Sequence, residues 1–315
     1  METRKIGSLE VTVVGLGGNN FGGRLDLEGT HRVVDAALDA GINFIDTANG
    51  YGGGKSEEFL GNVLGGRRAK VVLATKFGME VDGHRGGARP AYVRQACDES
   101  LRRLRTSWID LYQLHQPDPE TPIADTLAAL DELVRAGKVR EIGCSNFSAR
   151  EIREAHAAVR AGSARFVSVQ NELSLLHREP EREVLPGCEK HGLAFIPYFP
   201  LASGVLTGKY TSGGSAPVQG RLAQPSRYRE RFLNDRNVRI VKELEEFARL
   251  RGHSLLELAF CWLIAHAVVA SVIAGATEPE QVYANASSVG WNLTKGELAE
   301  VDRIAGHADD LARAG

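Results

Sequence analysis

Short apolar stretches alternate with longer amphipathic stretches along almost the whole chain. The apolar stretches, which have the length of buried β-strands, are residues 13–18, 42–47, 70–76, 109–115, 139–146, 164–172, 193–200 and 268–275. The amphipathic stretches, which are typical of helices, are residues 30–41, 55–66, 90–104, 122–137, 149–162, 180–192, 254–266 and 279–288. Apolar strands and helices in alternation indicate a parallel sheet covered by helices. Eight such units in 315 residues predict an α/β fold that closes into a (β/α)8 barrel, the TIM-barrel architecture.

Two segments fall outside this alternation. Residues 4–14 are expected to form a small N-terminal β-hairpin that turns at Gly7 and Ser8 and could plug the floor of the barrel. Residues 202–237 are rich in Gly, Ser and Pro and are expected to form a long, functional or disordered loop, and residues 235–252 add another helix. No boundary of a second domain is visible. Residues 1–315 are therefore predicted to form a single barrel domain without a separate cofactor domain.

The composition is that of an ordinary globular protein, with 43% hydrophobic and 25% charged residues and a formal net charge of -2. This balance argues against a dedicated nucleic-acid binder and favours a small molecule as the partner. No apolar run reaches the roughly 18 residues that a membrane helix needs, because Glu257 and His266 interrupt the longest one. The N-terminus lacks the pattern of a signal peptide. The four widely spaced cysteines predict buried thiols in a reduced, cytoplasmic protein.

The active site of such a barrel lies at the carboxyl ends of its strands. Polar residues that end the predicted strands are therefore candidates for chemistry. They are Asp46, Lys76, His115, Ser145, Asn146, Gln170, Asn171 and Tyr198, and Tyr51 lies in the loop just after Asp46. One histidine and one aspartate that converge with a lysine would repel a cation, so the set predicts no metal site.

Four of these residues together suit the delivery of a proton to a carbonyl oxygen. A free tyrosine has a pKa of about 10 and is a poor acid near neutral pH, but a nearby Lys76 ammonium would lower the pKa of Tyr51. Asp46 would hold the lysine in place, and His115 could hydrogen-bond the substrate oxygen. Each residue alone has a structural explanation, such as a turn cap or a core histidine, whereas all four at one rim favour chemistry. None is a nucleophile, so a cofactor must supply the electrons, which indicates hydride transfer.

Several ordered motifs resemble those of the aldo-keto reductase superfamily, and the similarity covers nearly the whole chain. "GINFIDTANGYGGGKSEEFLG" is similar to the family's block around its catalytic Asp and Tyr, and "VVLATKFG" is similar to its lysine strand. "SLRRLRTSWIDLYQLHQPD" resembles its helix–strand–His segment, and "GKVREIGCSNFS" resembles the block that follows. The resemblance implies a catalytic tetrad of Asp46, Tyr51, Lys76 and His115. It also implies a nicotinamide cofactor bound across the barrel mouth without a Rossmann domain.

The same resemblance assigns a cofactor pocket. Ser145, Asn146 and Gln170 are similar to the family's carboxamide-binding residues, and Tyr198 is similar to the aromatic residue that stacks on the nicotinamide ring. "PLASGVLTGKY" resembles the family's pyrophosphate loop, and "IAGATEPEQVYANAS" resembles its adenosine-end motif. The residues that these segments and the long loop contribute as candidates are Leu201, Gly204, Lys209, Arg221, Gly275, Thr277, Gln281 and Asn285.

The choice between NADPH and NADH depends on Glu278. Family members that favour NADPH often carry Lys or Arg beside the position of Thr277. A carboxylate there would repel a 2′-phosphate unless Lys209 or Arg221 compensates. Thr277 can donate a hydrogen bond and the resemblance favours NADPH, so NADPH is the predicted cofactor and NADH stays an alternative.

The sequence thus predicts an NADP-dependent aldo-keto reductase that reduces a small or sugar-like aldehyde or ketone, with Tyr51 as the proton donor. Two alternatives stay open. One is a sugar or alcohol dehydrogenase that works in the oxidative direction, because the same four residues serve both directions. The other is a cofactor-binding, redox-sensing regulatory subunit, because the "PLASG" region resembles that of potassium-channel β-subunits. Those relatives tend to lose the catalytic histidine, which this chain keeps as His115.

One glycine-rich stretch resembles a Walker A loop without matching it. A loop of that type ending on "GKS" at residues 54–56 would need glycine at position 49, where the chain has Asn49. The three glycines at 52–54 are instead expected to form the turn that brings Tyr51 over the barrel mouth. Ser56 is expected to cap the following helix, and Lys55 is then an ordinary surface charge.

A second glycine-rich stretch, "GLGGNNFGG", resembles a Rossmann fingerprint. That fingerprint would need glycine at position 20, where the chain has Asn20, and no helix opens directly after it. We therefore assign Asn19, Asn20 and Phe21 to a loop that lines the substrate mouth.

Overall fold

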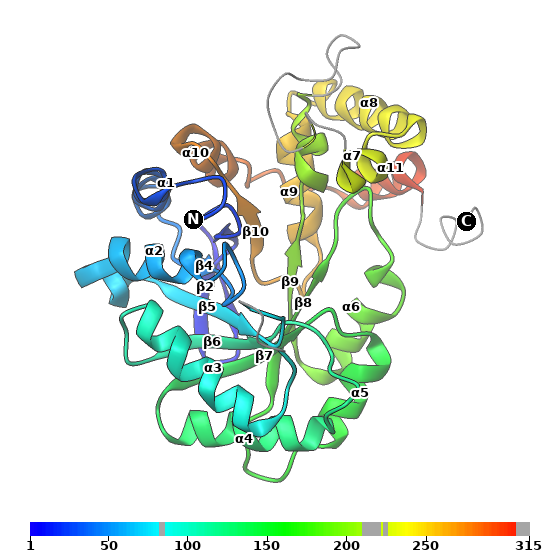
Figure 1. Cartoon of the computed structure of the whole chain (residues 1–315). Coiled ribbons are helices and arrows are strands. Elements are labelled where there is room, and N and C mark those ends of the chain that lie inside the picture. Colours follow the sequence, from blue (N-terminus) through cyan, green and yellow to red (C-terminus); the bar gives the residue numbers. More distant parts are fainter. Residues whose placement is uncertain (82–85, 210–221, 223–225, 307–315) are drawn as a thin grey trace.

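The computed structural model of the protein describes residues 1–81, 86–209, 222 and 226–306. A sheet of eight parallel strands forms its centre (Figure 1), in the spatial order β10-β3-β4-β5-β6-β7-β8-β9. The strands are β3 (Val14–Gly17), β4 (Phe44–Asp46), β5 (Val72–Phe77), β6 (Ile109–Leu114), β7 (Val139–Ser145), β8 (Phe166–Glu172), β9 (Ala194–Tyr198) and β10 (Val272–Gly275). Phe195 of β9 donates to the Val268 carbonyl (2.7 Å) and accepts from Ala270 N–H (2.9 Å), which joins β9 to the segment before β10. The predicted (β/α)8 barrel is confirmed.

Helices follow the strands and lie on the outside of the sheet (Figure 1). They are α1 (Leu27–Asp39), α2 (Lys55–Leu64), α3 (Pro90–Arg103), α4 (Ile123–Arg135), α5 (Ala149–Ala157), α6 (Pro180–His191), α9 (Leu255–Ala265) and α10 (Pro279–Ser287). Two 3-10 helices, η1 (Gly65–Lys70) and η2 (Ala202–Thr207), follow α2 and β9. Local sequence fixes where several of them begin. The hydroxyls of Ser148 before α5 and Ser254 before α9 each accept from the backbone N–H of a Glu three residues later. The side chain of that Glu accepts from the backbone N–H of the serine. These bonds satisfy N–H groups that would otherwise be unpaired.

The N-terminal hairpin packs against the inside of the barrel. Its strands β1 (Thr3–Ile6) and β2 (Leu9–Thr12) pair antiparallel around a turn at Gly7 and Ser8. Ile6, Leu9 and Val11 belong to one buried cluster with barrel-strand residues such as Phe44 and Leu111. The expected hairpin and its packing against the barrel interior are both confirmed. A larger cluster fills the space between the strands and the surrounding helices.

Among the described residues, three further helices extend the fold beyond the eight repeats. The expected helix after the long loop is confirmed as α8 (Asp235–Arg249), whereas the sequence pattern did not predict α7 (Arg227–Phe232) or α11 (Lys295–Ala305). Arg178 attaches α11 to the barrel. Its guanidinium is 2% exposed, contacts Glu181 (2.6 Å) and Asp302 of α11 (2.5 Å), and lies over the ring of Trp262.

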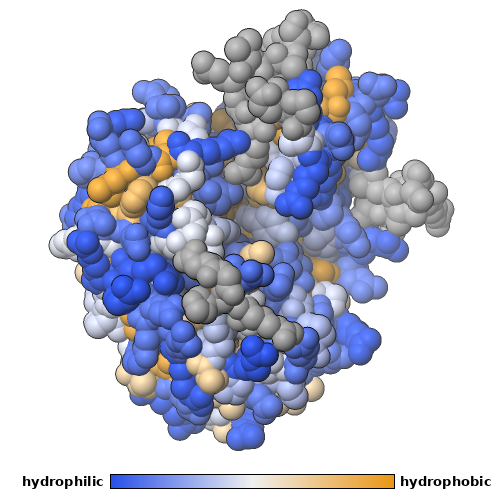
Figure 2. Space-filling view, in the orientation of Figure 1, coloured by the Kyte–Doolittle hydropathy of each residue, from blue (hydrophilic) through white to orange (hydrophobic). Residues whose placement is uncertain are grey.

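The four cysteines are buried thiols, as predicted. Within the described residues, no helix combines the length and the apolar character needed to cross a membrane. Figure 2 shows one face of the molecule, which is largely hydrophilic with scattered apolar patches. Few large apolar side chains are exposed in the described part of the chain, and Leu250 and Tyr283 are examples.

Candidate active site

Three strand ends and one turn bring four titratable side chains together at the carboxyl side of the barrel. Asp46 ends β4, Lys76 lies in β5, and His115 directly follows β6, while Tyr51 lies in the turn between β4 and α2. Lys76 and Asp46 are 1% and 3% exposed. The Lys76 ammonium donates to Asp46 Oδ2 (2.5 Å), to the Thr47 carbonyl (2.9 Å) and to the Tyr51 hydroxyl (3.5 Å). The structure therefore brings all four predicted residues into one cluster.

Glycine makes the turn that carries Tyr51. Gly52, Gly53 and Gly54 have φ values of 60°, 65° and 88°, a left-handed conformation that other residues adopt only with strain. α2 begins at Lys55, which is exposed as expected, with Gly54 as its N-cap. Ser56 is not the cap. Its buried hydroxyl lies 2.7 Å from Thr47 Oγ1 and donates to the Gly18 carbonyl (2.9 Å), so it joins this turn to the loop after β3 instead.

Lys76 is a stable cation in this arrangement. Burial of its ammonium opposes the charge, but the Asp46 carboxylate and the Tyr51 hydroxyl outweigh that effect and raise the pKa of Lys76 above its ordinary value of 10.5. Its ammonium lies 5.2 Å from the centre of the Tyr51 ring. Lys76 therefore stays protonated near neutral pH and presents a fixed positive charge to the Tyr51 hydroxyl.

His115 is neutral at the same mouth. Its ring meets the Tyr51 ring edge-on, with 5.9 Å between the centroids. Burial and the nearby Lys76 charge lower the pKa of His115 to about 3. Its Nδ1 atom is buried and has no hydrogen-bond partner among the described residues. Near neutral pH the imidazole can therefore donate or accept a hydrogen bond, but it holds no proton to give away as an imidazolium.

The second oxygen of Asp46 has two partners, one of which the sequence did not predict. Oδ1 accepts from Gln113 Nε2 (3.1 Å) and from Gln170 Nε2 (2.9 Å). Gln113 lies in β6 and is fully buried. It is two residues after Leu111, which belongs to the buried cluster of the barrel interior. Since alternate residues of a strand face the same side, this spacing was the signal that could have found it.

The residues predicted to bind the carboxamide form the neighbouring part of the mouth. Ser145 Oγ donates to the Gln170 carbonyl (2.7 Å), and Asn146 Nδ2 donates to the His115 carbonyl (2.9 Å). The Tyr198 hydroxyl donates to Asn146 Oδ1 (2.7 Å). Asn146 has a φ of 61°, which few residues other than glycine tolerate and which marks functional positions in many proteins. These contacts connect the ends of β6, β7, β8 and β9.

The loops after β9 and β10 carry the remaining predicted cofactor residues. In η2, Ser203 and Gly204 have φ values of 58° and 96°, so the backbone departs from helical geometry there. Burial and the positive charge of Arg24 lower the pKa of Lys209, so these two cations lie near each other although the sequence singled out only Lys209. The other members of the set that the structure describes are Leu201, Gly275, Thr277, Gln281 and Asn285. Arg221 lies outside the described residues.

The start of α10 is arranged around a glutamine. α10 begins at Pro279, as expected, and Gln281 Oε1 accepts from the Thr277 N–H (2.9 Å). A side chain added at Gly275 would approach Asn19 Oδ1 to 3.1 Å and Asn20 Nδ2 to 3.2 Å. The strand–helix junction thus packs closely against the side chains of the loop after β3.

The loop after β3 differs from the predicted substrate lining. Asn19 is exposed, but Asn20 is buried and donates to the Ala276 carbonyl (3.1 Å), and Phe21 is fully buried in the large core cluster. The assignment of Phe21 to the substrate mouth is wrong. Phe21 is an apolar residue inside a glycine-rich stretch, and the fold uses it for packing.

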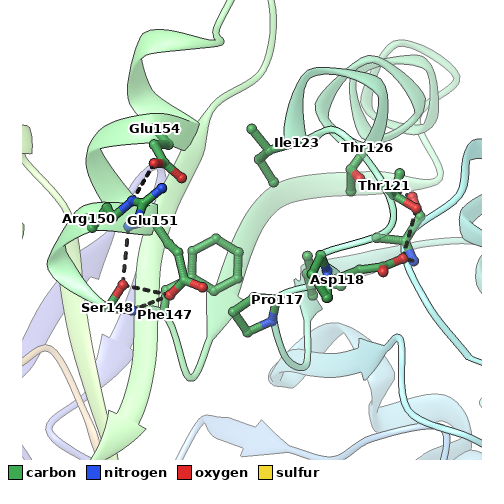
Figure 3. Close-up of a pocket in the computed structure, with 13 residues that line it drawn as sticks. Pro117, Asp118, Thr121, Ile123, Thr126, Phe147, Ser148, Arg150, Glu151 and Glu154 are labelled. Carbon is green, nitrogen blue, oxygen red and sulfur yellow. Dashed lines mark hydrogen bonds and ion pairs between the residues drawn. The ribbon is translucent and has the colours of Figure 1, made fainter.

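A cavity of about 650 Å³ lies beside this site, between the loop after β6 and the first turns of α4 and α5 (Figure 3). Leu114 and Phe147, which flank His115 and Asn146 in the sequence, line it. Asp118 also lines it, but its carboxylate accepts from two backbone N–H groups and the Thr121 hydroxyl. The lining contains none of the four clustered residues, so this cavity adjoins the acid–base cluster and is not part of it.

Comparison with known proteins finds relatives along almost the whole chain. The sequence model described as the aldo/keto reductase family matches residues 13–305. The chain is 33% identical over 310 residues to the aldo-keto reductase YhdN of Bacillus subtilis, covering 94% of this chain and 90% of that protein. It is 35% identical over 274 residues to a probable voltage-gated potassium channel subunit beta of Oryza sativa, covering 84% of this chain and 83% of that protein.

Two solved structures are similar throughout. The holo form of the aldo-keto reductase AKR11C1 from Bacillus halodurans aligns with a TM-score of 0.80 and 32% identity, over 96% of both chains. The glycerol dehydrogenase AKR11B4 from Gluconobacter oxydans aligns with a TM-score of 0.81 and 32% identity, over 96% of this chain and 94% of that one.

Proposed function

The chain belongs to the aldo/keto reductase family, and from this premise we propose that it reduces an aldehyde or ketone to the alcohol with a nicotinamide cofactor. The observation that carries the proposal is the Lys76 ammonium, placed between the Asp46 carboxylate and the Tyr51 hydroxyl. A lysine held charged beside a tyrosine favours loss of the phenolic proton. Tyr51 is the proposed proton donor.

Each residue of the cluster has a separate role in the proposed proton transfer. The cofactor supplies a hydride to the carbonyl carbon when it is bound. Tyr51 gives its proton to the carbonyl oxygen, and the charge on Lys76 stabilises the oxygen left on Tyr51. Asp46 holds Lys76 in place. His115 is neutral and lacks a partner at Nδ1 among the described residues, so we assign its proton to Nε2, from which it donates a hydrogen bond that orients the carbonyl oxygen.

The described residues fit a nicotinamide dinucleotide. Arg24 and Lys209 place two cations near each other, and the amino end of α10 adds backbone N–H groups, a combination that suits the phosphates. At the other end we propose that Ser145, Asn146 and Gln170 bind the carboxamide and that Tyr198 stacks on the ring. The remaining proposed contacts are Leu201, Gly204, Gly275, Thr277, Gln281 and Asn285, with Arg221 as a candidate outside the described residues.

We propose NADPH as the preferred cofactor. We propose that Arg24 and Lys209, which lie near each other, offset the negative charge of Glu278 and that Thr277 adds a hydroxyl for the 2′-phosphate. The alternative is NADH, for which the Glu278 carboxylate would suit a free ribose hydroxyl. Michaelis constants for both cofactors decide between them. A several-fold lower value for NADPH is expected, and a lower value for NADH would contradict the choice.

Two alternative functions have some support. A solved structure similar to this chain is described as a glycerol dehydrogenase, which favours the oxidative direction with a small polyol or sugar. A relative is described as a probable channel subunit, which favours a cofactor-binding regulatory role.

A panel of small aldehydes, ketones and the corresponding alcohols, followed at the nicotinamide absorbance, separates these functions. Reduction of at least one carbonyl is expected. A higher kcat/KM for the alcohols with the oxidised cofactor than for the carbonyls with the reduced one would favour the dehydrogenase. Binding of cofactor without turnover of any compound would favour the regulatory subunit.

A further inference from the structure

Gln113 occupies a position in the barrel interior where an apolar side chain would be the simpler choice. It is fully buried in β6. In the sheet it pairs with Lys76 of β5 on one side and with Gly143 of β7 on the other. A Cβ atom at Gly143 would lie 3.2 Å from Gln113 Cγ and 2.5 Å from Ser168 Oγ. The glycine thus leaves room beside the stem of the glutamine, whose amide group reaches the Asp46 carboxylate.

Asp46 determines which way the two amides face. A carboxylate only accepts hydrogen bonds, so Gln113 and Gln170 must both present their NH₂ groups to Oδ1. Gln170 Nε2 also lies 3.3 Å from Gln113 Oε1 and can donate to it. Both N–H groups of Gln170 then have acceptors. Its Oε1 remains as the atom with which Gln170 can bind another donor.

We propose that Gln113 is a positioning residue that joins the acid–base group to the nicotinamide-binding group. The Nε2 atom of its amide holds the Asp46 carboxylate, which in turn holds the Lys76 ammonium. The other end holds Gln170 so that its Oε1 accepts from the carboxamide N–H of the cofactor. This inference rests on the proposed function, because it concerns the same cofactor and the same proton transfer.

The inference accounts for a polar group that the four-residue cluster does not explain. Lys76 alone satisfies Oδ2 of Asp46, and Gln170 alone could satisfy Oδ1. With Gln113 removed, the amide of Gln170 would lose the acceptor that fixes its second N–H and could rotate. A small displacement of a group that orients a reactant can reduce the rate by about 100-fold.

Gln113→Met tests this account because methionine keeps the length of the side chain and removes the amide. The expected result is a kcat reduced about 10- to 100-fold and an NADPH dissociation constant raised several-fold, measured by nicotinamide fluorescence without substrate. Ser168→Ala is the matched control, since it removes a buried hydroxyl that has no hydrogen-bond partner in the described part of the chain. The kcat and the NADPH dissociation constant of Ser168→Ala should stay within about twofold of the wild-type values, because this hydroxyl takes no part in the hydrogen-bond network of Gln113, Asp46 and Gln170.

Gln113→Glu adds a readout that loss of packing would not produce. Near pH 8 the new carboxylate would face Asp46 and should reduce kcat more than methionine does. As the pH falls towards about 5, the carboxyl becomes protonated and can donate to Asp46 as the amide did. The ratio of variant to wild-type kcat should therefore rise as the pH falls, and the ratio for Gln113→Met should stay flat.

Several results would overturn the inference. A wild-type kcat and a wild-type NADPH affinity in Gln113→Met would do so. The inference also fails if the unfolded fraction of each variant accounts for its whole loss of kcat and the pH dependence of kcat stays that of the wild type. If the wild type binds NADPH but reduces no carbonyl, the proposed function fails while the binding comparison still decides the inference. If the wild type binds neither NADPH nor NADH, both are wrong.

Discussion

The chemistry of this site depends on the charge states of three neighbouring side chains. Lys76 is positive because Asp46 lies 2.5 Å from it inside the barrel. Burial, together with that charge, lowers the pKa of His115 and keeps it neutral. Tyr51 lies 3.5 Å from the same ammonium and is half-buried at the mouth. The buried ion pair therefore places a positive charge beside the Tyr51 hydroxyl, and burial together with that charge leaves His115 without an imidazolium proton.

The neutral state of His115 makes a prediction for the pH dependence of stability. Its pKa is about 3 in the folded protein and about 6.5 in the unfolded chain. Between these values the unfolded chain binds a proton that the folded protein does not, so His115 makes the protein less stable as the pH falls from 6.5 towards 3. The slope is at most about 1.4 kcal/mol per pH unit.

His115→Gln should remove this contribution. Urea denaturation at about pH 7 and about pH 5 measures the loss of unfolding free energy in each protein. We expect a smaller loss of unfolding free energy in the variant than in the wild type. The other buried histidines contribute equally to both proteins, so their effect cancels in the comparison. Equal losses would mean that His115 is protonated in the folded state.

At the scale of elements, close contacts between neighbouring units set where the site residues stand. α2 follows the Tyr51 turn and packs against the end of α3, where Gly61 faces the backbone of Arg103 and Leu104. A Cβ atom at Gly61 would lie 2.4 Å from the Arg103 carbonyl oxygen. Glu57, also in α2, is completely buried and pairs with the Arg103 side chain (2.7 Å) and the Thr75 hydroxyl. These contacts fix α2, and with it the turn, against β5 and α3.

Gly61→Ala should therefore destabilise the protein by about 1–3 kcal/mol, because backbone atoms must move to admit the methyl group. Gly187→Ala is the matched control. It also lies inside a helix, α6, but the nearest atom to its added methyl would be Ala149 Cβ at 3.9 Å. We expect that change to be neutral or stabilising by up to about 1 kcal/mol. Thermal denaturation measures the melting temperature of each variant. Equal changes in melting temperature for the two variants would contradict this account.

For the whole molecule, the alternation of apolar and amphipathic stretches was enough to predict the barrel and the rim at which Asp46, Lys76 and His115 meet, and a turn at Gly7 and Ser8 predicted the hairpin. These features depend on periodicity and strand order, which a sequence displays directly. Tyr51 could be placed because three glycines mark its turn. The ends of the later strands likewise placed Ser145, Asn146, Gln170 and Tyr198 at this rim, and the resemblance to a known family added their cofactor-binding role. The structure connects these residues by hydrogen bonds.

Features that depend on the packing of distant segments could not be predicted. Ser56 was expected to cap a helix, and it bonds across to Thr47 and Gly18 instead. Phe21 was expected at the mouth, and it is buried in the core. Arg24 carries no local signal of its own, since it acquires its neighbour Lys209 only when separate loops converge. Gln113 shares a strand face with the buried Leu111, but its partner Asp46 lies on another strand, so its role could not be predicted from its position alone.

The claim at the centre of this account is that Tyr51 gives the proton to the carbonyl oxygen. Steady-state turnover of Tyr51→Phe, together with its NADPH dissociation constant, tests that claim most directly. The account predicts a kcat lower by about 10²- to 10⁴-fold and a dissociation constant close to that of the wild type, because the hydroxyl is lost and the proposed cofactor contacts remain. Turnover by Tyr51→Phe near the wild-type rate would contradict it.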